Sequence, residues 1–286
     1  MMTKHLFIPA LPKARASVPL GLAAVVAAAV LTGARAEDED SGPTQLDLST
    51  VPSELVDDVV LPVPHEIFHA LEKLGPQDWN SQIRAESPEP PPNRTRAALL
   101  FGLVLANGFI AVEAENRDEV RRIGREVVQF SEALGVKQAV MEHAQSIMDA
   151  ANDQEWQSVR RELDRTRETV LETMEKLRDD DLAHLVSLGG WLGGADILAA
   201  LAGGSPAAIE LLHQPDLVEQ LMRSCRKMPP ALRAEPVIRE VERVLQELQP
   251  LLRNADGGGL PPADLQRVHD LTSELIRLIE GAPNNG

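Results

Sequence analysis

The sequence predicts an all-α fold, an irregular bundle of about ten helices around one buried central helix. First, residues 97–114 are apolar on all sides, which is typical of a helix that other helices surround. Second, most other segments carry apolar residues at spacings of three and four, between proline, glycine and capping residues. Third, no stretch alternates apolar and polar residues as a half-buried strand does.

The central helix, residues 97–114, is expected to follow Asn93, whose side chain can accept a hydrogen bond from a first-turn amide. One of its faces holds small residues spaced by four: Ala98, Gly102 and Ala106. The other strongly apolar helix, residues 182–201, carries two glycine pairs with the same spacing: Gly189/Gly193 and Gly190/Gly194. Residues four apart share a helix face, so both helices present a surface without bulk. We therefore predict that the two helices cross at these small residues.

A membrane span is the alternative interpretation of residues 97–114. A spanning helix needs about 20 mostly apolar residues. Here Arg96 and Glu113 enclose sixteen, and Asn107 among them is costly in hydrocarbon. The arginines between residues 117 and 125 would satisfy the positive-inside tendency only if the N-terminal leader stayed attached. We therefore favour a core helix.

Glycine, proline and capping residues set the bounds of the remaining helices. The first four of these are predicted over residues 64–74, 116–134, 136–151 and 153–178. Gly75 and Gly135 each end a helix, because glycine readily adopts the left-handed conformation. Asn152 with Glu155 forms a capping box that starts the longest helix. Four shorter helices follow, each with a proline in its first turn: Pro206, Pro215, Pro236 and Pro262.

Residues 1–36 have the pattern of a secretory signal peptide. Basic residues precede an apolar stretch, and the small residues Ala34 and Ala36 mark the expected cleavage site. The mature chain is then expected to be exported, to a bacterial periplasm or the medium. It would comprise an acidic flexible tail (residues 37–47), a single helical domain (48–280) and a disordered C-terminus (281–286). A proline-rich linker loop (76–92) would lie within the domain.

The mature chain is strongly acidic. The whole sequence has a formal net charge of −16, and the leader holds four bases and no acid, so its removal leaves −20. This charge repels phosphate groups, and the chain has no tyrosine and few other aromatic residues to stack on bases. We therefore expect no nucleic-acid partner, and no stable membrane span after cleavage. Cys225 is the single cysteine, which excludes an internal disulfide and favours a buried thiol.

Residues 65–69, His-Glu-Ile-Phe-His, match the zinc motif H-E-x-x-H. On a helix, His65 and His69 would hold the metal from one face, and Glu66 would act as general base. However, Pro64 places His65 in the first turn of a short helix, and no third ligand is marked by its spacing. We therefore expect His65 and His69 to be two solvent-facing histidines. The alternative is a zinc-dependent hydrolase with zinc as its cofactor.

A second metal pattern repeats the E-x-x-H spacing of di-iron helix bundles, in the pairs Glu66/His69 and Glu210/His213. Such a centre needs four long helices that run side by side, whereas both pairs lie on short predicted helices. In so acidic a chain, chance accounts for this spacing.

Three polar residues interrupt the two apolar helices: Asn107, His184 and Asp196. Each needs a hydrogen-bond partner if it is buried. In the first interpretation, the partner is a neighbouring arginine, a backbone carbonyl or solvent. In the second, the partner is a ligand in a small polar site between the helices. Trp191 would line such a site, so these four residues are the candidate ligand-binding residues.

The leading hypothesis is an exported, acidic, all-helical protein without catalysis, which binds an unknown protein or small ligand or acts as a scaffold. One alternative is the zinc hydrolase built on Glu66. The other is a carrier that holds a small apolar ligand in a cavity between the two central helices. The carrier requires a void there, and glycines in tight contact without a void would exclude it.

Overall fold

The computed structural model describes residues 71–203, 206–213, 215–253 and 260–281, and the backbone of residues 55–56 and 59–60. At helix positions 167, 168, 171, 175, 206 and 215 the structure describes the backbone alone. The predicted signal peptide, the acidic tail and the His-Glu-Ile-Phe-His segment (residues 1–36, 37–47 and 65–69) lie outside the described residues, as do residues 282–286. All the described elements belong to one compact unit, residues 45–286.

The helices in chain order are α2 (Trp79–Gln82), α3 (Arg94–Glu113), α4 (Arg117–Leu134), α5 (Lys137–Asn152), α6 (Trp156–Leu177), α7 (Asp180–Ala202), α8 (Pro206–Leu212), α9 (Pro215–Lys227), α10 (Pro230–Arg233), α11 (Pro236–Arg253) and α12 (Pro262–Glu280). The two strands are β1 (Leu55–Val56) and β2 (Val59–Val60). The predicted all-α fold is confirmed. No strand was expected, but β1 and β2 pair antiparallel over two residues each, with Leu55 opposite Val60.

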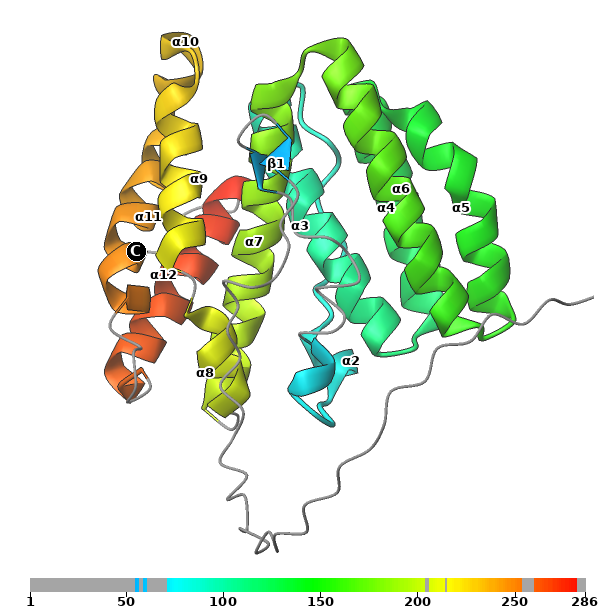
Figure 1. Cartoon of the computed structure of the whole chain (residues 1–286), viewed down its shortest axis with the longest axis horizontal. Coiled ribbons are helices and arrows are strands. Elements are labelled where there is room, and N and C mark those ends of the chain that lie inside the picture. Colours follow the sequence, from blue (N-terminus) through cyan, green and yellow to red (C-terminus); the bar gives the residue numbers. More distant parts are fainter. Residues whose placement is uncertain are drawn as a thin grey trace, which may run out of the picture. The chain divides into compact units, whose positions relative to one another are not determined.

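The predicted crossing of the two apolar helices is confirmed, and α3 and α7 form the most extensive helix contact of the described fold (Figure 1). Their backbones touch. A Cβ atom built on Gly102 would lie 2.1 Å from the carbonyl oxygen of Val186, and one on Gly189 would lie 2.1 Å from the carbonyl oxygen of Leu99. Real Cβ atoms do not approach other atoms so closely, so only glycine fits at either position.

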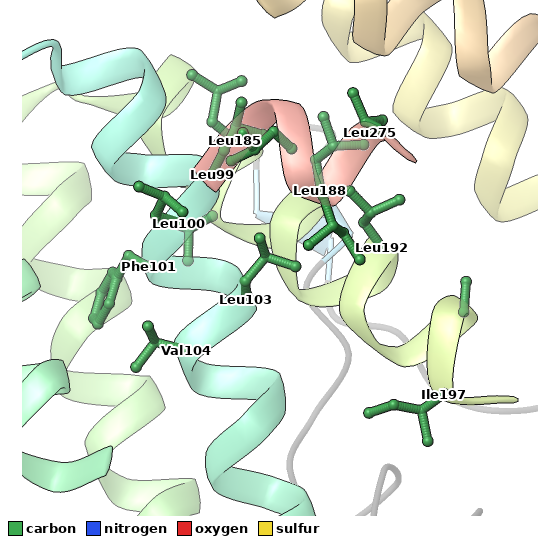
Figure 2. Close-up of a cluster of buried hydrophobic side chains, with 14 of the residues drawn as sticks. Leu99, Leu100, Phe101, Leu103, Val104, Leu185, Leu188, Leu192, Ile197 and Leu275 are labelled. Carbon is green, nitrogen blue, oxygen red and sulfur yellow. The ribbon is translucent and has the colours of Figure 1, made fainter. Parts of the chain in front are cut away.

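Leucine side chains surround this backbone contact. Figure 2 shows Leu99 and Leu103 of α3 on the side that faces Leu188 and Leu192 of α7. All four are at most 4% exposed, so the contact is sealed from water. On another side of α3, Phe101 stacks on Phe130 of α4, with ring centroids 6.4 Å apart. The central helix is therefore packed on both sides, as its uniformly apolar sequence predicts.

The other helices cover this pair. α4 packs on α3, α5 joins α4 to α6, and α12 and α8 pack on α7. α3 and α7 are both long and apolar enough to cross a membrane, but 78% and 61% of their most apolar windows are buried within the protein. In the described fold they serve as core helices.

Helix boundaries follow the predicted signals in most places. Asn93 and Asn116 cap α3 and α4 by accepting hydrogen bonds from the amides of Arg96 (2.7 Å) and Glu119 (3.2 Å). Gly75 and Gly135 are both left-handed, with φ of 69° and 83°. These positions agree with the sequence analysis.

The predicted capping box at Asn152 is wrong. Asn152 is the last residue of α5, and its side-chain oxygen accepts a hydrogen bond from Arg121 instead (3.0 Å). The chain reverses at Gln154, which takes the left-handed conformation with φ of 60°. α6 therefore begins three residues later than predicted, at Trp156. The short helices α2 and α10 were not predicted, and α2 lies within the predicted linker loop, residues 76–92.

We predict that Gly102→Ala destabilises the protein by about 3 kcal/mol, because the new methyl group would meet backbone atoms of α7 that cannot move aside. Gly124→Ala is the matched control: it lies inside α4, a Cβ there meets nothing within 4 Å, and removing a helical glycine should stabilise by about 1 kcal/mol. Urea unfolding followed by circular dichroism measures both. Equal midpoints for the two variants would contradict the close crossing.

Candidate functional site

A cavity of about 310 Å³ lies beside the helix crossing, among α3, α6 and α7. Its lining on these three helices includes Phe101, Leu105, Phe109, Leu163, Val170, Met174, Val186, Trp191, Gly194 and Leu198. α4 and α5 contribute Val127 and Val140, and α8 and α9 contribute leucines at one end. Gly102, Val186 and Gly190 of the crossing also line the cavity, so it opens beside the contact between the two central helices and extends to α6.

The described wall is almost entirely apolar and carries no charged side chain. Thr166 and Ser187 bring its two hydroxyl groups. Each donates to the carbonyl oxygen four residues earlier in its own helix: Thr166 to Glu162 (2.7 Å) and Ser187 to Ala183 (2.9 Å). Neither hydroxyl hydrogen is free to donate into the cavity, so the described wall offers mainly apolar contact.

The two glycine pairs of α7 have different surroundings. Gly189 and Gly193 face α3, where added Cβ atoms would lie within 3.0 Å of other atoms. Gly190 and Gly194 line the cavity, where the nearest atom to an added Cβ is 3.7 Å away at Gly190 and none lies within 4 Å at Gly194. The second pair is therefore not required for helix packing, and its lack of side chains keeps the cavity open.

An ion pair lies next to one end of the cavity. Arg160 Nη2 of α6 lies 2.8 Å from Glu113 Oε1 at the end of α3, and its Nη1 lies 3.9 Å from Glu72. Ile110 and Leu163 line the cavity one helical turn from Glu113 and Arg160, which places the pair at that end. The Glu113 side chain is only 7% exposed. Burial raises the pKa of Glu113 above its usual value, although the Arg160 charge opposes the rise.

Asn107 and Asp196 turn away from this cavity and both hold Arg84, in the proline-rich segment 76–92. The Arg84 backbone amide donates to Asn107 Oδ1 (2.8 Å), and Asn107 Nδ2 donates to the Arg84 carbonyl (3.3 Å). The Arg84 guanidinium forms an ion pair with Asp196. Asp196 also accepts from the hydroxyls of Thr272 (2.8 Å) and Ser273 (2.6 Å) in α12. The described structure therefore gives both residues partners within the protein.

A second set of contacts holds the same segment on α4. Arg122 Nη2 donates to the Arg84 carbonyl (2.9 Å), and the backbone amide of Ser87 donates to Glu126 (3.3 Å). Arg122 and Glu126 also pair with each other. Residues 84–87 are thus fixed to three helices, although their composition resembles a linker.

The other two candidate residues lie on α7. Trp191 lines the cavity and is half-buried. His184 is not among the described lining residues. It lies one turn after Asp181, whose pKa is raised by partial burial against the opposing charge of His184. Of the four candidates, the structure brings only Trp191 to the cavity.

The described residues contain no group of three or more histidine, cysteine or carboxylate side chains that could hold a metal ion. His65, Glu66 and His69 lie outside the described residues. His213, the other histidine of the di-iron pattern, contacts the backbone carbonyl of Leu252 through Nδ1 (2.7 Å).

Comparisons of the chain with known protein families, with characterised proteins and with solved structures found no match. Its function is therefore inferred from its own side chains. The sequence marked one part of the cavity, Trp191, whereas the second glycine pair was expected to pack on α3 and lines the cavity instead. It gave no sign of the α6 wall, because the apolar residues Leu163, Val170 and Met174 read equally well as an ordinary packing stripe.

We predict that Asp196→Ala destabilises the protein by about 3 kcal/mol, since it removes the most buried acceptor of the Arg84 guanidinium and the acceptor of the Ser273 hydroxyl. Glu280→Ala is the control: Glu280 lies 3.7 Å from the same guanidinium but is 35% exposed, so about 0.5 kcal/mol or less is expected. Chemical denaturation of both variants gives the comparison. Similar losses would show that Asp196 does not anchor the segment.

The Cys225 thiol should be unreactive in the folded protein. Cys225 is 1% exposed, and burial, assisted by the charge of Glu242, raises the pKa of its thiol to about 12. The thiolate is the reactive form, so an aromatic disulfide reagent at about pH 8 should modify no thiol in native protein and one per chain in denaturant. Rapid modification of the native protein would contradict this burial.

Proposed function

We propose that this protein is a non-catalytic binding protein that holds a small, uncharged apolar molecule in the cavity among α3, α6 and α7. The observation that carries the proposal is the cavity itself: about 310 Å³ with no charged side chain in its described wall. Known ligand pockets begin at about this size and are mostly apolar. A charged ligand would find no compensating group inside.

The second glycine pair supports the same proposal. An empty apolar cavity costs stability, because its lining atoms lack packing partners. Any larger side chain at Gly194 would fill part of the space, and the helix would gain stability from the loss of a glycine. An open cavity at a position so easily filled favours a ligand-binding role over a purely scaffolding one.

The predicted leader adds a location to this proposal. If residues 1–36 are removed during export, as the sequence predicts, binding takes place outside the cytoplasm. The net charge of −20 of the mature chain then keeps the carrier away from anionic lipid surfaces and nucleic acids.

The test uses N-phenyl-1-naphthylamine, an uncharged apolar dye whose fluorescence rises in an apolar site. Wild-type protein should bind the dye, and Gly194→Leu should weaken binding by about tenfold or more, because the new side chain occupies the cavity. Gly124→Leu in α4 is the matched control and should leave affinity unchanged, since Gly124 does not line the cavity.

Two outcomes would overturn the proposal. One is the absence of dye binding to folded wild-type protein. The other is equal affinity in the Gly194→Leu and Gly124→Leu variants, which would place the dye elsewhere on the surface. Circular dichroism of each variant establishes that it is folded before binding is compared.

A further inference from the structure

α6 forms one wall of the cavity through a single face, with Leu163, Thr166, Val170 and Met174 at spacings of three and four. Along its length it packs on α5, whereas its contacts with α3 and α7 are sparse. The cavity occupies the space where closer packing would otherwise be. The α5–α6 hairpin is therefore a wall that stands apart from the central helix pair.

The two ends of this wall are attached differently. At its C-terminal end, α6 passes through a short turn into α7, and Asp179 in that turn pairs with Arg94 of α3 (2.9 Å). At its N-terminal end, the described ion pair with α3 is the one between Arg160 and Glu113, next to the fully buried Val159. The first end is held by the chain itself and the second by side chains, so the geometry resembles a hinge and a latch.

The electrostatics of the Arg160–Glu113 pair suit a contact that opens. The pKa of Glu113 is raised, which means that the attraction of Arg160 does not fully offset the cost of burying the carboxylate. Neighbouring carboxylates at Glu72 and Glu115 add to that cost. When the pair separates, water hydrates both charges and recovers part of the cost.

We propose that the Arg160–Glu113 ion pair is the latch of the cavity: its separation lets the α5–α6 hairpin move off α3 and admits the ligand. This inference rests on the proposed binding function. The ligand then enters at the end of the cavity bounded by Ile110 and Leu163, and the hinge at the α6–α7 turn stays closed.

The first test measures opening without any ligand. In Glu113→Gln, the carboxylate charge is lost while the shape is kept, so separation no longer gains the hydration of that charge, and amide hydrogen exchange in α6 residues 160–174 should become about tenfold slower. Glu126→Gln is the matched control, because Glu126 is similarly buried and paired with an arginine but lies away from the cavity. It should leave exchange in α6 unchanged.

The second test measures entry. The association rate of N-phenyl-1-naphthylamine should fall about tenfold in Glu113→Gln and stay at the wild-type value in Glu126→Gln. The double variant Glu113→Met/Arg160→Met should act in the same direction. An apolar pair stays closed without any desolvation cost, so both the exchange of α6 and the association rate should fall below wild type.

The outcomes separate the two proposals. If the dye does not bind to wild-type protein, the binding function fails, while the exchange of α6 still reports on the latch. If the dye binds but Glu113→Gln matches Glu126→Gln in both exchange and association rate, the latch is overturned and the binding function stands. If Glu113→Gln does not fold, the double variant decides: unchanged or faster exchange of α6 overturns the latch.

Discussion

The described fold depends on the backbone contact between α3 and α7. Gly102 and Gly189 let the two helices approach until carbonyl oxygens and glycine atoms touch, and leucines then seal the contact. Gly189 lies against Leu99 and Gly193 against Ala106, so the helices run in the same direction. A parallel pair cannot be joined by a short turn. The three helices α4, α5 and α6 therefore make the return connection, and they wrap the same side of α3 (Figure 1).

The same sequence pattern produces both the contact and the cavity. Four glycines in α7 form two pairs displaced by one residue, which corresponds to about 100° around the helix. Gly189 and Gly193 point to α3, whereas Gly190 and Gly194 point to the space in front of α6. A single stretch of sequence thus sets where the chain packs most tightly and where it stays open.

The sequence predicts the parts of the fold that local chemistry determines. The apolar helices, the asparagine caps and the left-handed glycines follow from propensity and hydrogen bonding within one turn. It does not predict contacts made over long distances. Arg84 lies in a proline-rich stretch, and nothing in that stretch indicates that its backbone binds Asn107 and its guanidinium binds Asp196, 112 residues away. The cap at Asn152 fails for the same reason, because Arg121 in another helix takes the side chain.

The polar contacts around the apolar core are more numerous on one side than on the other, and this difference indicates where the structure can move. On one side, Arg84 is held by contacts to Asn107, Arg122 and Asp196, so the loss of any one leaves others in place. On the cavity side, Arg160 and Glu113 tie the start of α6 to α3, and the cost of burying that carboxylate works against them. Local opening follows the region with the fewest buried apolar contacts and the weakest polar ties. In the described fold α6 combines sparse contacts with α3 and α7 with this strained tie, so we expect local opening at this wall of the cavity.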